Sequence, residues 1–249
     1  MKIFFPFQSK DIGGTSIFAK KFQAGMETRG HEVFSEYRPD YDVLFLIVQA
    51  PFSYLWDAKR KGKKIVQRLD GVYYWSVAGW RYPIYNLKAF LIRHLFADIS
   101  IYQSDYSKRS VERFLGKKRG ERAITIYNGV DTTLFSVDGP IKNLRAYADQ
   151  KIVFCASEFR RTDQIMPILS SLEAYRERFG NDIKLVLAGK FHRELDGFET
   201  KLQQYPWVQF LGKIPNVDLP QYLRAADVFV FTHLNPPCPN NILEAMACG

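Results

Sequence analysis

The sequence predicts an α/β protein with two domains, each built around a parallel sheet. Three observations carry this prediction. Strand-like apolar runs alternate with helix-like segments along all 249 residues, the alternation breaks once near the middle, and 47% of the residues are hydrophobic. Regular alternation of strands and helices favours a parallel sheet with helical crossovers. The length suits one large domain or two of ordinary size, and the composition allows a sizeable core.

The first half of the chain contains short apolar runs that predict strands, separated by segments with helical spacing. The first strand, "KIFFPF", leads through a loop into a helix over Thr15 to Arg29, which Gly30 closes. The predicted strands are 2–7, 31–34, 43–48, 64–69, 98–104 and 123–128, and the other predicted helices are 83–96 and 106–114.

The alternation breaks down between Asn128 and Gln150, which we interpret as a linker, and it restarts beyond. We therefore place a domain boundary between residues 147 and 148, giving domains 1–147 and 148–249. The predicted strands of the second half are 151–157, 183–189, 208–212 and 227–233, and its predicted helices are 164–179, 194–204, 218–226 and a last helix from residue 240. Each half has the pattern of a Rossmann-like domain, and we expect the second, with four strands, to be incomplete.

Composition favours a cytoplasmic protein. The three cysteines form no CxxC pair, so neither disulfides nor structural zinc are expected. The apolar start "MKIFFPF" is too short for the core of a signal peptide, and no run is long enough to span a membrane.

Positive charge is concentrated in the first half of the chain. Residues 1–147 contain 24 Lys and Arg against 14 Asp and Glu, whereas residues 148–249 contain 11 against 12. A one-sided basic surface suggests a polyanionic partner, such as an anionic membrane leaflet, a phosphorylated substrate or nucleic acid. A merely solvated basic face is the alternative. No nucleic-acid-binding motif is recognisable, so we do not expect a nucleic-acid partner.

A glycine pair lies where the first predicted strand meets the first helix. Gly13 and Gly14, in "DIGGTSIF", would let the backbone approach a ligand, and the helix that follows offers free N–H groups to an anion. The pattern is not the G-x-G-x-x-G of dinucleotide enzymes, which disfavours a dehydrogenase. A plain tight turn is the alternative.

Two stretches of the second half follow strands at the sheet edge where ligands bind in such folds. Arg160 and Arg161, in "CASEFRRTD", could hold a diphosphate, although solvated loop arginines are the alternative. In "PPCPNNILEAMACG", Asn240 is a candidate helix N-cap. Glu244, one turn further, could accept hydrogen bonds from a vicinal diol such as ribose, or could be an exposed helix residue.

No metal site is expected. "PDYD" (39–42) spells D-x-D, which holds a metal in another class of sugar transferases, but here it precedes a strand and therefore lies at the wrong end of the sheet. The four histidines, His31, His94, His192 and His233, show no ligand spacing.

Several segments in order along the chain resemble the retaining glycosyltransferases of family 4, which have the GT-B architecture of two Rossmann-like domains facing each other across a cleft. The matching segments are "GGTSIFAKKFQAGMETRGHEV" (13–33), "ADISIYQSDYSKRSVERFLG" (97–116), "IYNGVDTTLF" (126–135) and "NNILEAMACG" (240–249). Together they extend over nearly the whole chain, which makes the resemblance far more specific than any one segment.

The resemblance implies roles for single residues in binding a nucleotide-sugar donor. Glu244 matches the second glutamate of the family's E-x7-E motif, which is expected to hold the ribose, whereas Pro236 stands in place of the first glutamate. Arg160 matches the arginine that faces the donor diphosphate. The family's lysine three residues further on is Asp163 here, which should weaken phosphate binding unless Arg161 substitutes.

The remaining matches concern the reaction centre. Gly13 and Gly14 match the first-domain loop that approaches the donor phosphates, and Asn240 and Asn241 begin the helix whose N-terminus faces the donor. Asp70, in "RLDG", falls where the family often has a His or Asp near the transferred sugar, although an Asp-Gly turn explains that position equally well.

The resemblance implies an enzyme that moves a sugar from a nucleotide-sugar to an acceptor hydroxyl of a glycan or a lipid-linked molecule, with retention. It implies no metal and no cofactor, a cytoplasmic location, and the inner face of the membrane as a further place of action. A non-catalytic nucleotide- or membrane-binding protein of the same fold is the alternative. Because the last helix should lead into another strand, we expect the 249 residues to be a C-terminally truncated fragment whose own activity is low or absent.

Overall fold

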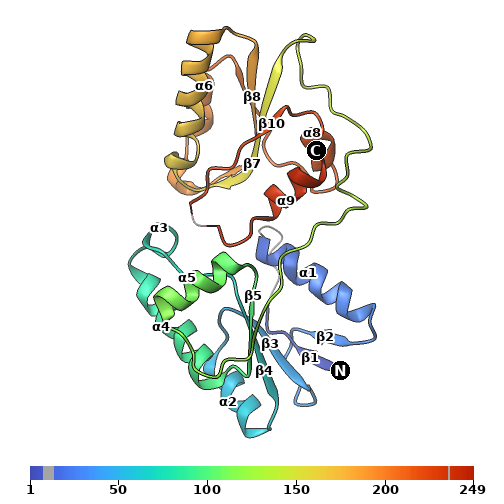
Figure 1. Ribbon diagram of the computed structural model, residues 1–249, viewed down its shortest axis with the longest axis vertical. Helices are drawn as coiled ribbons and strands as arrows, with labels where there is room; N and C mark the ends of the chain where they lie inside the picture. Colours follow the sequence, from blue (N-terminus) through green and yellow to red (C-terminus); the bar gives the residue numbers. More distant parts are fainter. Residues whose placement is uncertain (8–13, 235) are drawn as a thin grey trace. The chain divides into compact units, whose positions relative to one another are not determined.

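The computed structural model describes residues 1–7, 14–234 and 236–249. The chain divides into two compact units, Met1–Asn128 (unit 1) and Gly129–Gly249 (unit 2), which Figure 1 shows in colours that follow the sequence. Unit 1 contains a six-stranded sheet and unit 2 a four-stranded sheet. Every strand pairing in both sheets is parallel, as the alternation of strands and helices predicts.

The sheet of unit 1 has the strand order β2-β1-β3-β4-β5-β6. Its strands are β1 (Lys2–Phe4), β2 (Glu32–Phe34), β3 (Val43–Ile47), β4 (Lys64–Leu69), β5 (Ile99–Tyr102) and β6 (Ala123–Thr125). Its helices are α1 (Gly14–Glu27), α2 (Phe52–Arg60), α3 (Trp75–Ala78), α4 (Tyr82–Leu91) and α5 (Asp105–Leu115), with a 3-10 turn η1 (Gly79–Arg81) and a π-helical turn η2 (Ile92–Phe96) on either side of α4.

Helices cover both faces of this sheet because successive side chains of its strands point to opposite faces. Phe5 and Phe45 pack beneath α1, where Phe22 stacks on Phe45 with ring centroids 4.4 Å apart. Side chains of the other face, such as Leu44 and Ile65, pack against α2 and η2. Figure 1 shows α1 on one side of the strands and α4 and α5 on the other.

Helix α2 is absent from the sequence-based prediction. Only two of its residues, Leu55 and Ala58, are buried, so its apolar stripe is a single pair of residues one turn apart. The exposed Trp56 between them hides the helical period in the sequence. The short helix α3 is too brief for any periodicity to appear.

The sheet of unit 2 has the strand order β10-β7-β8-β9. Its strands are β7 (Lys151–Phe159), β8 (Ile183–Phe191), β9 (Val208–Phe210) and β10 (Val228–Phe229). Its helices are α6 (Met166–Phe179), α7 (Phe198–Leu202), α8 (Leu219–Leu223) and α9 (Asn240–Ala247), with 3-10 turns η3 (Thr162–Gln164) and η4 (Arg193–Leu195).

Residues of β7 alternate between two cores. Val153 and Cys155 pack with α6 and α7 on one face of the sheet. Ile152 and Phe154 pack on the other face with α8, α9 and two residues of the segment between the units, Phe135 and Leu144.

Residues 129–150, predicted as a linker, are therefore part of unit 2. Phe135 is fully buried, and the guanidinium of Arg224 donates from Nε to the carbonyl of Pro140 at 2.9 Å and from one terminal nitrogen to that of Ser136 at 3.0 Å. The division between the compact units falls between residues 128 and 129, some twenty residues before the boundary placed from the sequence pattern. The segment has no regular secondary structure, so its few buried residues leave no periodic signal in the sequence.

Candidate functional site

The sheet of unit 2 has its topological switch point between β7 and β10. From β7 the chain builds β8 and β9 on one side, and β10 is then added on the other side of β7. Connections that leave β7 and β10 therefore diverge to opposite faces of the sheet, and ligands of open parallel sheets bind at the carboxyl ends of the strands at such a point. The stretches that follow β7 and β10 are the two that the sequence singled out in this half.

Helix α9 is fixed at this switch point by a side chain near its start. Asn241 donates from Nδ2 to the carbonyl oxygen of Ala156 in β7 at 2.9 Å, and its Oδ1 accepts from the backbone N–H of Ile242 at 3.1 Å. The prediction that Asn240 is the N-cap is wrong by one position. Pro239 occupies the N-cap, and Asn240 is the first helical residue. A proline fits there because the first N–H groups of a helix have no partner within it.

Glu244 is buried within α9, with 5% of its surface exposed. The alternative that it is an exposed helix residue is therefore wrong. Acidic side chains are almost never buried unless they are paired or serve a ligand, because removing a carboxylate from water costs several kcal/mol, about 2–7 for even an uncharged polar group. The position places a carboxylate one turn inside the helix that begins at the switch point.

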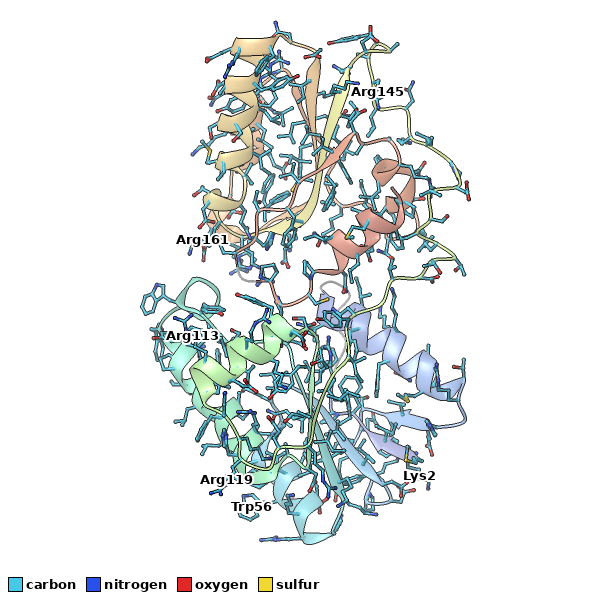
Figure 2. The ribbon with its side chains drawn as sticks, viewed as in Figure 1. Lys2, Trp56, Arg113, Arg119, Arg145 and Arg161 are labelled. Atoms are coloured by element: carbon cyan, nitrogen blue, oxygen red, sulfur yellow. The ribbon has the colours of Figure 1, made fainter. Side chains whose placement is uncertain are left out.

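The loop after β7 carries two arginines, each paired with an acid two residues away. Arg160 contacts Glu158 at 2.9 Å, and Arg161 contacts Asp163 at 2.7 Å. All four side chains are at least 32% exposed, so these pairs are worth little, about 0–1 kcal/mol each. Both arginines are exposed to solvent, as the alternative of solvated loop arginines requires, but each also pairs with a neighbouring carboxylate. Figure 2 labels Arg161 at the same end of unit 2 as the start of α9.

A hydrogen-bonded network that sequence reasoning missed ties this loop to the segment after β10. Gln164 accepts at Oε1 from the backbone N–H groups of Arg160 (2.6 Å) and Arg161 (3.1 Å). Its Nε2 lies 2.9 Å from Nδ1 of His233, and Nε2 of His233 bonds the hydroxyl of Ser157 on β7. The hydroxyl of Thr232 donates to the Gln164 carbonyl at 2.5 Å. The loop after β7 is thus held in place by hydrogen bonds between residues that are 68 to 76 positions apart in the sequence.

The two bonds of Gln164 settle which nitrogen of His233 carries the proton. Because Oε1 accepts from two backbone N–H groups, the amide must present its NH₂ group to His233, and Nδ1 must accept. The proton is then on Nε2, which donates to Ser157. An imidazole in this tautomer cannot take a proton from the hydroxyl, so the pair is not a Ser–His nucleophile.

Burial lowers the pKa of His233 below its ordinary 6.5, and the Arg160 guanidinium lowers it further, against weaker opposing effects of Glu158 and Asp163. The ring also stacks on Phe231, with centroids 5.0 Å apart. The neutral form of His233 is therefore the stable one at neutral pH, which agrees with the tautomer that the hydrogen bonds require.

In unit 1 the candidate residue Asp70 follows β4 and lies at the carboxyl edge of that sheet. It pairs with the nearly buried Arg68 at 2.7 Å. Burial raises the pKa of Asp70, and Arg68 opposes that rise. Arg68 also donates to Gln103 and Asn128, both at 2.9 Å, so three strand ends contribute to one polar cluster.

The glycine pair of unit 1 is only partly described. Gly14 is the first residue of α1, which follows β1 at the switch point between β1 and β3. Gly13 lies outside the described residues. Phe18 of α1 contacts β4, because the guanidinium carbon of Arg68 lies 3.7 Å from the centre of its ring.

Asp40 and Asp42 lie at the amino end of the unit 1 sheet. Asp40 pairs with the side chain of Lys2, and Asp42 accepts from the Lys2 backbone N–H at 2.8 Å. Both carboxylates thus bind the start of β1, one through the charged side chain of Lys2 and the other through its backbone. Within residues 1–7, 14–234 and 236–249, no group of three or more His, Cys, Asp or Glu side chains is arranged to hold a metal ion. Across the same residues, no helix combines the length and the apolar content that crossing a bilayer requires.

Similarity to solved structures defines the class of the fold. All of the chain aligns with 78% of Anabaena HepE in complex with UDP and glucose, with a TM-score of 0.74 and 20% identity. All of it also aligns with 79% of sucrose-phosphate synthase from Thermosynechococcus elongatus, with a TM-score of 0.77 and 17% identity. For trehalose-6-phosphate synthase OtsA, 85% of the chain aligns with 56% of that protein, with a TM-score of 0.62 and 13% identity. The fold is accordingly of the GT-B class, with two Rossmann-like units, as the sequence predicted.

The family match concerns unit 2. Residues 149–249 match the family model described as "Glycosyl transferases group 1". The resemblance stated from the sequence motifs is thereby confirmed for these residues. The match includes the Arg160–Asp163 loop, the network around His233 and helix α9. A search of curated proteins found no match.

Proposed function

We propose that this protein is a glycosyltransferase that moves a sugar from a nucleotide-sugar donor to an acceptor hydroxyl with retention and without a metal ion. The observation that carries the proposal is the buried carboxylate of Glu244 on a helix that Asn241 ties to the switch point of unit 2. The family match includes the same residues, and HepE was solved with UDP and with UDP-glucose bound.

Glu244 is proposed to hold the ribose of the donor. A carboxylate can accept two hydrogen bonds from a vicinal diol, and bonds to an ionised acceptor are about twice as strong as neutral ones. The start of α9 at Asn240 and Asn241 would direct backbone N–H groups and the positive end of the helix dipole toward the donor.

Arg160 and Arg161 are proposed to hold the diphosphate. Their present partners, Glu158 and Asp163, leave the loop without net charge, but both ion pairs are exposed and weak. A diphosphate carries more charge than either carboxylate and accepts forked hydrogen bonds, so it can displace them at small cost. Gln164 fixes the backbone of both arginines, which keeps the loop in place while its side chains change partners.

Transfer itself is proposed to need no protein nucleophile. The departing diphosphate gains negative charge, which the arginines and the start of α9 would stabilise, and its leaving oxygen would take the proton of the acceptor. Asp70 is proposed to contact the transferred sugar, with Gly13 and Gly14 approaching the donor phosphates. The pairing of Asp70 with Arg68 would fix its orientation.

The acceptor is proposed to be a glycan or a lipid-linked alcohol. A lipid-linked acceptor would bring the enzyme to the inner face of an anionic membrane, where the excess positive charge of the first half of the chain favours association. No nucleic-acid partner and no cofactor are part of this proposal, and the location proposed is the cytoplasm.

Thermal denaturation with a panel of nucleotides and nucleotide-sugars tests the donor site. A ligand at about 100 times its dissociation constant stabilises the folded state by ~2.7 kcal/mol, which raises the midpoint measurably. We expect UDP or another nucleoside diphosphate and its sugar to do so. Glu244→Gln should weaken that binding by about 1.5–3 kcal/mol, whereas Glu177→Gln on the exposed end of α6 should not. Equal binding by all three proteins would refute the role of Glu244.

A non-catalytic binding protein of the same fold is the second candidate, because Pro236 and Asp163 stand where the family has a glutamate and a lysine. Incubation with a donor that binds, followed by detection of the released nucleoside diphosphate, separates the two. Turnover that survives a chelator supports the metal-independent transferase. NMR of the anomeric proton of the product reports retention.

A further inference from the structure

Unit 1 exposes large apolar side chains along α3, η1, α4 and η2. Five of them are more than half exposed, and we call this set the α3–α4 surface: Trp75, Trp80, Ile84, Leu87 and Leu95. Isolated exposed apolar residues are ordinary, but these five lie within 21 consecutive positions, and patches that gather in this way mark interaction sites.

The exposed apolar stripe lies on a helical segment whose opposite side packs against the core of unit 1. Ala89, Ile92 and Phe96 are buried against the sheet of unit 1, whereas Ile84 and Leu87, three residues apart, point to solvent. A helix that is apolar on both sides is normally covered on both sides. The core of unit 1 does not need the exposed side, so we look for a partner that covers it.

Charge identifies that partner. Between Asp70 and Asp98 the sequence contains no carboxylate, but it contains Arg81 and Lys88. Arg81 lies over the ring of Trp80 at 5.2 Å, and Lys88 lies 5.7 Å from the ring of Phe52 on α2. Long cationic side chains beside exposed aromatic rings can bury their stems in an apolar phase and keep their charges at its edge.

Helix α5 extends the surface with the same chemistry. Phe114 is 55% exposed and contacts Tyr74 with ring centroids 5.7 Å apart, and Arg113 lies 5.6 Å from its ring. Figure 2 shows Arg113 on the side of unit 1 where α3 and α4 lie. Arg93, the remaining cation of the carboxylate-free stretch, is buried and paired with Glu121, so it takes no part.

We propose that the α3–α4 surface docks this protein on a membrane leaflet that contains anionic lipid. Trp and Tyr prefer the level of the headgroups, and helices that lie in the interface present Leu, Ile and Trp to the acyl chains with Lys and Arg beside them. A second copy of this chain fits less well. A two-fold contact would bring Arg81 and Lys88 against the same two cations, with no carboxylate in the stretch to pair them.

This inference deepens the membrane part of the proposed function and is independent of the donor site. All of its residues belong to unit 1, whereas Glu244 and the arginine loop belong to unit 2. Loss of docking therefore leaves the nucleotide-induced thermal shift unchanged, and loss of that shift leaves docking unchanged, so either proposal can fail alone.

Co-sedimentation with vesicles tests the docking surface. Vesicles of phosphatidylcholine mixed with phosphatidylglycerol should bind the protein at low salt and release it at high salt, and vesicles of phosphatidylcholine alone should bind it far less. Arg81→Glu and Lys88→Glu should each lower binding at least fivefold, since one cation near an anionic leaflet accounts for about fivefold. The double variant Ile84→Ser/Leu87→Ser should lower binding at both salt concentrations.

Phe179→Ser is the matched control, because this equally exposed aromatic residue ends α6 in unit 2. It should bind vesicles as the parent does. All variants change exposed side chains, and their thermal midpoints should confirm that they fold. Equal binding to both kinds of vesicle, or unchanged binding by the unit 1 variants, would overturn the proposal. So would a dimer in sedimentation equilibrium that Leu87→Ser dissociates while vesicles bind neither protein.

Discussion

Replacing His233 by asparagine should remove a pH dependence from the stability of unit 2. Asn keeps an acceptor close to the position of Nδ1, so Gln164 can still donate to it, but an amide does not titrate. In the parent protein, protonation would put a second N–H on the ring, facing the NH₂ group of Gln164 at 2.9 Å. Two donors would then meet, and the bond that supports the backbone of Arg160 and Arg161 would be lost.

The direction of the pH effect follows from the lowered pKa of His233. Above about pH 6.5, the ordinary pKa, neither the folded nor the unfolded chain binds this proton, and the contribution of the neutral ring is complete. As the pH falls below that value, the unfolded chain binds the proton first, so the free energy of unfolding falls. The loss continues until the pH passes the lower pKa of the folded state.

The size of the effect is bounded by one proton. The free energy of unfolding can change by at most about 1.4 kcal/mol per pH unit from His233. Burial is the largest cause of the shift, followed by Arg160, and both act in the same direction. Glu158 and Asp163 face the ring and oppose them, so removing either carboxylate should widen the pH range of the loss.

Urea denaturation of the parent and His233→Asn proteins, from about pH 7.5 to about pH 5 where histidines titrate, measures the difference. The two proteins should differ least in the acidic part of that range, because the parent loses stability there and the variant does not. His192→Asn, which replaces an exposed histidine of the same unit, is the matched control. Parallel curves for parent and His233→Asn would refute the reasoning.

Three further substitutions test other parts of the structure. Gly189→Ala should destabilise unit 2 by more than about 2 kcal/mol in urea, because the backbone has φ +133° and a Cβ atom would lie 1.7 Å from the Ser157 carbonyl oxygen; a stable variant would contradict that contact. Glu121→Gln should cost about 3–5 kcal/mol, since it leaves the buried Arg93 guanidinium without its charged partner, and a loss below about 1 kcal/mol, the usual value of an exposed pair, would count against this. Asp70→Asn should lower the rate of sugar transfer and leave the nucleotide-induced thermal shift intact, and an unchanged rate would remove Asp70 from the site.

The central strands of the sheets could be predicted from sequence because they are buried on both faces. Runs such as "VLFLIV" and "KIVFCAS" are apolar at nearly every position. The structure places β3 within the first run, and β7 starts with the second and extends two residues beyond it. Segments that bury only a few side chains could not be predicted in this way. Helix α2 buries only two side chains, and residues 129–150 bury isolated ones such as Phe135, so neither segment has a period that a sequence reader can detect.

Some residues of the candidate site can be recognised from a local motif, whereas others depend on contacts between distant parts of the chain. Glu244 and Arg160 stand in short segments with a recognisable pattern, and their sequence neighbours reveal them. His233 acts through Ser157 and Gln164, which are 76 and 69 positions away, and no spacing along the chain records such a contact. The sequence did place His233 at the end of a predicted apolar strand, just before the Pro-rich loop. Its contacts with Ser157 and Gln164 depend on the strand order, which brings β10 next to β7.

The departure of Asp163 from the family pattern has a structural counterpart that should reduce its effect in the proposed donor site. Asp163 does not stand alone against the donor, because Arg161 neutralises it at 2.7 Å, just as Glu158 neutralises Arg160 at 2.9 Å. The loop therefore offers no net attraction to an approaching diphosphate, and its contribution must come from the geometry of two guanidinium groups whose backbone Gln164 fixes. Since both ion pairs are exposed, exchanging them for phosphate contacts costs about 0–1 kcal/mol each, less than a charge-assisted bond of about 1.5–3 kcal/mol returns. If the loop holds the donor diphosphate as proposed, preorganisation by the network around His233 takes over part of the role that a lysine at position 163 would have had.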